Sequence, residues 1–150
     1  MQAAQQNDSY CLAHGSEAGI LWWRQPGYWH YRMNRGHQIT DHEVLHYLHI
    51  MAELRPGRRA PLLLDRSNPY SATFEAMETL RCYGPGHCNA LAIFAPTVMA
   101  KMAAQVAINH YDTFEHTTIR HELHEAENWI RQFVADGSHA YCEAPAPLCA

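Results

Sequence analysis

Short apolar runs alternate with longer segments of helical periodicity from about residue 19 onward. The clearest example is residues 60–76, APLLLDRSNPYSATFEA, in which three leucines end on Asp65 and a polar loop follows. We interpret the leucine run as a buried strand and Ser71 as the N-cap of a helix over about 72–83, the strand–loop–helix unit of an α/β sheet. Ligands bind at the carboxyl ends of such strands, so the pattern predicts where a site lies but not its chemistry.

The rest of the chain repeats this alternation. An aromatic hairpin opens it, with strands at about 20–23 and 28–31 joined by a Pro-Gly turn. Thr40 and Glu43 have capping-box spacing for a helix that ends near residue 54. The later elements expected are a strand at 90–94, a helix from Pro96 or Thr97 to about 110, a strand at 117–121 and a helix at 122–134. This order predicts a mixed α/β fold, with a mostly parallel central sheet of about five strands, an N-terminal β-hairpin and about four helices.

The 150 residues suffice for one domain with a sizeable core. Residues 1–15 are small and polar, which predicts a flexible arm. Residues 16–136 carry the periodic pattern and form the single domain. Residues 137–150 are rich in small residues and proline, so we expect a disordered tail.

Composition narrows the class of protein. The apolar fraction of 47% and the charged fraction of 17% are typical of a globular chain. A net charge of -4 argues against nonspecific nucleic-acid binding, which needs a basic face. No apolar run approaches the roughly 20 residues of a membrane span, and no signal-peptide pattern opens the chain. The five cysteines are irregularly spaced, and we interpret them as reduced thiols. Together, these features predict a cytoplasmic protein.

A literal H-E-x-x-H motif runs from His42 to His46 in the helix after Thr40. On a helix, this motif presents two imidazoles as zinc ligands and a glutamate, here Glu43, as general base on a zinc-bound water. However, His42, His46 and His49 share a stripe opposite the apolar residues and should face solvent. The capping box also engages Glu43. We therefore expect a solvated polar face, no metal and no cofactor.

Two groups of residues are candidate functional positions. The first is the loop after the leucine strand, with Asp65, Arg66, Ser67 and Ser71. Asp65 is expected to bond loop amides or to stand at the rim of a pocket. A hydroxyl at a helix N-terminus, as we expect for Ser71, also tolerates a phosphate.

The second group lies in the aromatic hairpin. Alternate residues of a strand face opposite sides, so one set should be core and the other an apolar patch for a dimer partner or a ligand. The candidate interaction surface comprises Trp22, Trp23, Tyr28, Trp29 and Tyr31.

Several short motifs follow one another in a recognisable order over about residues 19–135. They are Gly19-Ile20-Leu21, Thr40, Pro61-Leu62-Leu63-Leu64-Asp65-Arg66 with Ser71 and Glu75-Ala76, Ala90-Leu91-Ala92-Ile93-Phe94, and Glu125-Ala126 with Trp129-Ile130. In these motifs the sequence resembles small bacterial proteins related to STAS domains and sporulation-type anti-sigma-factor antagonists. The resemblance implies a central sheet with helices and no established catalytic activity.

In the antagonist branch of that family, a partner kinase phosphorylates a serine at the start of a helix. Ser71 is the nearest match in position, but Tyr70 precedes it where an Asp-Ser pair is usual. We expect a non-enzymatic regulatory or protein-interaction domain with a protein partner, a homodimer being one form. Two alternatives stay open: a small zinc-dependent hydrolase using His42, Glu43 and His46, and a small-molecule or lipid-binding module.

Overall fold

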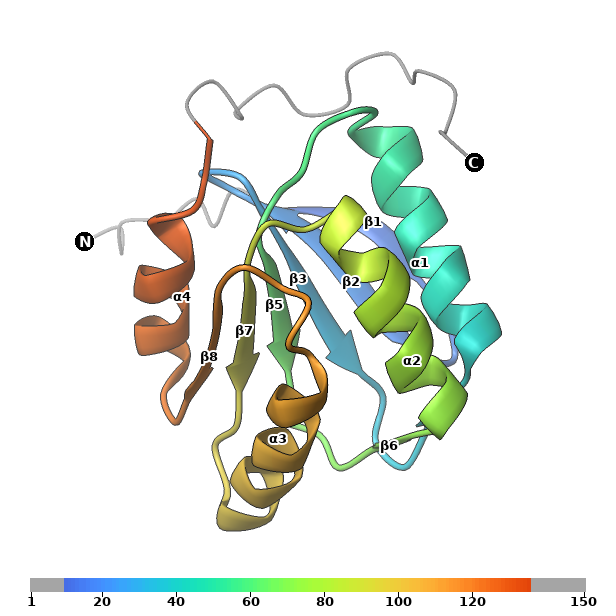
Figure 1. Ribbon diagram of the computed structural model, residues 1–150, viewed down its shortest axis with the longest axis vertical. Helices are drawn as coiled ribbons and strands as arrows, with labels where there is room; N and C mark the ends of the chain where they lie inside the picture. The colour runs from blue at the N-terminus through green and yellow to red at the C-terminus, as the bar shows by residue number, and fades with distance from the viewer. Residues whose placement is uncertain (1–9, 136–150) are drawn as a thin grey trace, which may run out of the picture.

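The computed structural model describes residues 10–135, in which helices cover both faces of a sheet (Figure 1). Six strands form the sheet in the order β1-β2-β3-β5-β7-β8. They are β1 (Tyr10–Gly15), β2 (Gly19–Arg24), β3 (Tyr28–Met33), β5 (Leu62–Asp65), β7 (Leu91–Phe94) and β8 (Thr117–Arg120). A second, two-stranded sheet joins β4 (Gln38–Ile39) and β6 (Ser71–Ala72). The helices are α1 (Asp41–Leu54), α2 (Phe74–Tyr83), α3 (Val98–His110) and α4 (Leu123–Arg131), with a 3-10 turn, η1, at Gly84–Gly86.

The topology confirms the expected fold class. Strand β2 runs antiparallel to both β1 and β3, whereas β3, β5, β7 and β8 are parallel to one another. Tyr31 of β3 lies opposite Leu64 of β5, which lies opposite Ile93 of β7, so these three side chains form one layer on one face. The fold is therefore mixed α/β with an antiparallel start and four helices.

The sheet has one strand more than the sequence analysis expected. Tyr10–Gly15 form β1, which pairs antiparallel with β2 through a bulge between Leu12 and His14. The prediction of a flexible arm over residues 1–15 is wrong for residues 10–15, because the open edge of β2 offers backbone donors and acceptors that this segment satisfies. Residues 1–9 and the expected tail at 137–150 lie outside the described residues.

Capping signals in the sequence located the starts of two helices, α1 and α3. Thr40 caps α1 in a complete capping box with Glu43, and Thr97 caps α3. The assignment of Ser71 as the N-cap of α2 is wrong: Thr73 is the cap, and its Oγ accepts a hydrogen bond from the amide of Ala76 at 3.0 Å. Ser71 instead belongs to β6, where its amide donates to the carbonyl oxygen of His37 at 3.1 Å. Pairing across 34 residues of sequence thus overrides the local cap preference of a serine.

The two faces of the sheet carry separate cores. Helices α1, α2 and α3 pack on one face, which we call the cavity face, with side chains such as Trp23, Trp29 and Leu62. Helix α4 packs on the other, the α4 face, where Tyr28 and Leu63 belong to a small cluster with Ala126 and Ile130. Figure 1 shows α4 on one side of the strands and α1 and α2 on the other.

Candidate functional site

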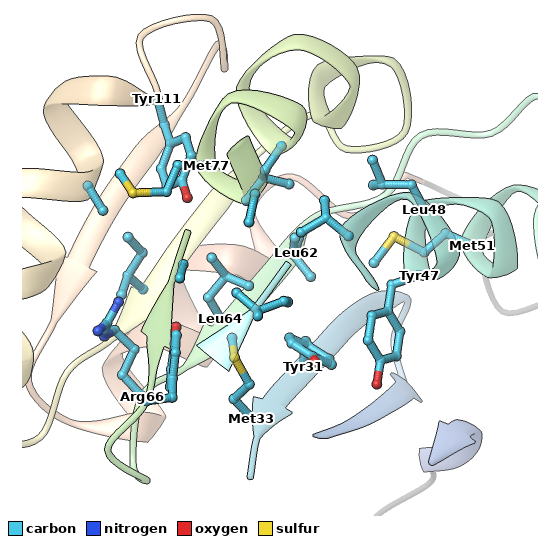
Figure 2. Close-up of a pocket in the computed structure, with 18 residues that line it drawn as sticks. Tyr31, Met33, Tyr47, Leu48, Met51, Leu62, Leu64, Arg66, Met77 and Tyr111 are labelled. Atoms are coloured by element: carbon cyan, nitrogen blue, oxygen red, sulfur yellow. The ribbon is translucent and has the colours of Figure 1, made fainter. Parts of the chain in front are cut away.

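A cavity of about 80 Å³ lies between the sheet and helices α1, α2 and α3. Aliphatic side chains, methionines and tyrosines form its wall, and Figure 2 shows strands and helices both contributing to it. Met33, Met51 and Met77 are among the lining residues. Methionine is flexible and polarizable, so this wall adapts its shape to an occupant at low cost.

The sequence of α3 explains why space remains there. The residues that α3 buries are Ala104 and Ala107, which are too small to fill the gap above the sheet. Its larger apolar side chains point outward: Val98, Met99, Met102 and Val106 are 60–77% exposed. Helix α3 therefore covers the cavity with alanine and presents an apolar stripe to the surroundings.

Within the described part of the chain, Arg66 is the one charged side chain in the cavity wall. Its guanidinium lies over the ring of Tyr70, with Cζ 4.3 Å from the ring centroid. Among residues 10–135, no carboxylate pairs with Arg66. Figure 2 shows Arg66 at one end of the cavity, far from Tyr47 and Leu48 at the other. The cavity thus has an apolar body and a cationic end.

Two tyrosines of the wall keep their protons. Burial raises the pKa of Tyr70, and the nearby Arg66 guanidinium lowers it by less than burial raises it. Burial also raises the pKa of Tyr111. Both phenols therefore remain neutral at physiological pH and can donate or accept hydrogen bonds.

The candidate residues of the loop after β5 separate onto opposite sides. Arg66 reaches the cavity, whereas Asp65 is buried beneath the α4 face and 5% exposed. Oδ1 of Asp65 accepts a hydrogen bond from the Ser67 amide at 2.9 Å, which is the loop-amide role expected of it. Ser67 and Ser71 are exposed, and Ser71 does not stand at a helix N-terminus, so the electrostatic argument for a phosphate there no longer holds.

A buried histidine, missed by the sequence analysis, joins Asp65. Nε2 of His30 lies 2.8 Å from Oδ2 of Asp65, and Nδ1 of His30 lies 3.2 Å from a guanidinium nitrogen of Arg24. Because a guanidinium only donates, Nδ1 accepts and Nε2 carries the hydrogen donated to Asp65. Both ring nitrogens of His30 are engaged, so this side chain is not an available base. We call the contacts of His30 with Asp65 and Arg24 the clamp, because they join β3 to β5 and to β2.

Electrostatics and α4 reinforce this clamp. Burial alone would raise the pKa of Asp65, but the hydrogen bonds from His30 and Ser67 together outweigh it and hold that pKa below its ordinary value. Arg24 also pairs with Glu127 of α4 at 3.4 Å, and the Tyr28 hydroxyl donates to the same carboxylate at 2.8 Å. A histidine that faces the core from a buried strand needs a hydrogen-bond partner, so the sequence indicates that one exists. It does not identify the partner, because 35 residues separate His30 from Asp65.

The hairpin aromatics do not form the expected interaction surface. Trp23, Tyr28, Trp29 and Tyr31 are each at most 5% exposed. Strand β3 lies between β2 and β5 and is covered on both faces, so its alternating side chains enter two different cores. Of the five residues, only Trp22 is partly accessible, and it lies against the His30 ring.

The H-E-x-x-H motif is arranged as its helical stripe predicted, with His42 and His46 exposed. Glu43 completes the capping box with Thr40, and its carboxylate also lies 2.7 Å from Nε2 of His37. These contacts engage the proposed base, and no observation favours the zinc hydrolase. In the described part of the chain, the donor atoms that converge as a metal would require belong to the exposed Glu122, His124 and Glu125.

The strand order and the helices on both faces of the sheet define a mixed α/β fold. No protein-family model matches the sequence, and no curated protein matches it. Among solved structures, the chain is similar to an uncharacterised protein from the DUF3478 family with a SpoIIAA-like fold, from Shewanella loihica PV-4. The TM-score is 0.54 at 13% identity, over 75% of this chain and 92% of that one. The likeness confirms the fold that the motifs suggested. A separate finding is that none of the helices within residues 10–135 has the length and apolar character needed to cross a membrane.

Proposed function

We propose that this protein is a non-enzymatic binding domain that holds a small amphipathic carboxylic acid in the cavity beneath α1, α2 and α3. The apolar wall would take the hydrocarbon part of the ligand, and Arg66 would pair with its carboxylate. The observation that carries this proposal is the guanidinium of Arg66 at the end of an otherwise apolar cavity, with no acidic partner among the described residues.

The chemistry of the wall supports binding over catalysis. Tyrosine, methionine, aliphatic residues and Arg66 line the cavity, and histidine, cysteine, serine, aspartate and glutamate are missing from the lining set drawn from residues 10–135. Such a wall offers neither a nucleophile with a base nor a general acid near neutral pH. Apolar pockets with one well-placed charged group are typical of ligand-binding sites.

The volume limits the size of the ligand. At about 80 Å³, the cavity is smaller than the engineered protein cavity of about 150 Å³ that binds benzene. Hexanoate has eight non-hydrogen atoms against six in benzene, so it exceeds this space and would enter only as the methionines of the wall move around its tail, with its carboxylate at Arg66. Guanidinium and carboxylate pair in bidentate fashion, which selects an acid over the corresponding alcohol.

The test is a titration of the full chain with hexanoate and with hexanol, followed by amide chemical shifts in NMR. We expect hexanoate to bind more tightly, with shifts concentrated around the cavity. The substitution Arg66→Gln should weaken the binding of hexanoate by about tenfold or more, because the bidentate pair with the carboxylate is lost, and leave the binding of hexanol unchanged. Arg32→Gln is the matched control, because Arg32 stacks on Trp22 outside the cavity. Equal binding of acid and alcohol would contradict the proposal.

A second candidate function, contact with a protein partner, is favoured by the outer side of α3. Val98, Met99, Met102 and Val106 are spaced to form one exposed stripe, and exposed apolar patches mark interaction sites. A second copy of this chain is the partner to examine first. Light scattering across protein concentrations should then show a dimer that Met102→Lys disrupts, and a monomer at every concentration would exclude the homodimer.

A further inference from the structure

A second hollow, of about 490 Å³ and open to solvent, lies on the outer side of α1. Three segments far apart in sequence form it: the end of β1 with the turn that follows, the loop before β4, and the first half of α1. The sequence pattern alone does not connect these segments, because residues 1–15 were expected to form a flexible arm. We call this hollow the histidine groove.

Four histidines line the histidine groove: His14, His37, His42 and His46. The ring of His14 lies edge-on to that of His46, with 4.9 Å between centroids. His42 and His46 are one helical turn apart, which places both imidazoles on the same side of α1. Strand β1 thus brings a third imidazole to the pair that the H-E-x-x-H motif supplies.

The charge of the groove favours a cation. Glu17 and Glu43 belong to its wall, and the described wall contains neither lysine nor arginine. His37 already pairs with Glu43 at 2.7 Å, which leaves His14, His42 and His46 as the imidazoles available for a new ligand. Imidazole nitrogen suits zinc, nickel and copper, whereas magnesium and calcium prefer oxygen ligands.

We propose that His14, His42 and His46 bind one divalent late transition-metal ion in the histidine groove. Their nitrogen atoms are not drawn together as a chelating set in this structure, so binding requires the side chains to rotate. The exposure of His42 and His46 on α1 permits that rotation. A site with three protein ligands leaves the fourth position of a tetrahedral ion to water. Because Glu43 is held by Thr40 and His37, the site binds metal without hydrolytic chemistry.

Calorimetric titration of the untagged full chain with zinc chloride, and separately with nickel chloride, tests the proposal. We expect one site per chain, and affinity reduced by about tenfold or more in each of His14→Ala, His42→Ala and His46→Ala, since loss of a direct ligand costs at least as much as loss of an outer contact. His49→Ala is the matched control: it lies on the same helix, outside the groove, and pairs with Glu53 at 2.8 Å. That variant should bind like the wild type.

A second control addresses the exposed cluster of Glu122, His124 and Glu125. His124→Ala should leave the affinity unchanged, and binding that disappears in this variant would overturn the proposal. Unchanged binding in His14→Ala, with loss in His46→Ala, would also overturn it, because the site would then be a helix pair without β1. Cobalt absorption in the visible range gives a readout of nitrogen ligation, and circular dichroism confirms that each variant is folded.

Discussion

The two faces of the sheet differ in how their polar and apolar groups are satisfied. On the α4 face, Asp65, His30 and Arg24 form a continuous chain of contacts that ends on Glu127 of α4. On the cavity face, Arg66 stands beside unfilled space without a carboxylate partner among residues 10–135. Asp65 and Arg66 are adjacent in sequence. Because successive side chains of a strand point to opposite faces of the sheet, Asp65 lies on the α4 face and Arg66 on the cavity face.

This contrast separates stability from binding. Buried charged groups that are fully paired stabilise a particular arrangement of strands and helix, and breaking the pair is costly. A cationic side chain next to an adaptable apolar cavity costs little to change and is free to meet a ligand. We therefore expect substitutions on the α4 face to act on folding and those on the cavity face to act on binding.

The largest expected difference between the faces comes from neighbouring residues. Asp65→Ala leaves the buried His30 without its carboxylate partner, which should reduce the free energy of unfolding by about 3 kcal/mol. Arg66→Gln should change it by less than about 1 kcal/mol, because no ion pair is lost. Urea denaturation of the two variants measures both values.

A double replacement shows whether the clamp is the cause. His30→Leu combined with Asp65→Leu removes both polar partners together, and should recover part of the stability that Asp65→Ala loses. Equal losses in Asp65→Ala and Arg66→Gln would show that the two faces do not differ in the way described.

Local signals in the sequence predicted the parts of the fold that depend on neighbouring residues. The capping box of Thr40 and Glu43 formed as expected, and of the two residues expected to open the third helix, Pro96 and Thr97, the second is its cap. The role of Ser71 could not be read in the same way, because both Ser71 and Thr73 are good caps and only pairing with Gln38 decides between them. Strand β1 likewise depends on the edge that β2 offers.

The cavity could not be predicted from the sequence. An alanine- and methionine-rich helix from Pro96 or Thr97 to about residue 110 was expected, but not that its alanines would face the sheet and its methionines the surroundings. That orientation depends on how α3 packs beside α2 and β8. The pairing of His30 with Asp65 similarly needs the parallel register of β3 and β5.

Two buried alanines offer a matched comparison of packing on the two faces. Ala126 of α4 belongs to the filled cluster with Tyr28 and Leu63, whereas Ala107 of α3 lines the cavity. Ala126→Leu should overpack its site and reduce the free energy of unfolding by about 1–3 kcal/mol. Ala107→Leu has space to occupy, so its stability should stay within about 1 kcal/mol of the wild type while hexanoate binding is lost.

Thermal or urea unfolding measures the first effect, and the NMR titration with hexanoate measures the second. A large destabilisation by Ala107→Leu would mean that the cavity closes in solution. Retained hexanoate binding in that variant would place the ligand elsewhere.

The smallest expected effect is the change with pH in the stability that the contact between Asp65 and His30 contributes. The pKa of Asp65 is lower in the folded protein than its ordinary value of 3.8, so the ionised carboxylate contributes stability above that value. As pH falls below 3.8 and through the lower folded pKa, this contribution is lost, because the folded state must take up a proton that the unfolded chain already binds. The stability difference between wild type and Asp65→Asn should therefore be constant from pH 7 to about 5 and shrink between pH 4 and 2. Urea midpoints at several pH values measure it. Arg66→Gln, which alters the cavity face alone, should differ from the wild type by the same amount across the range, and a matching acid-dependent loss there would assign the effect to the loop as a whole.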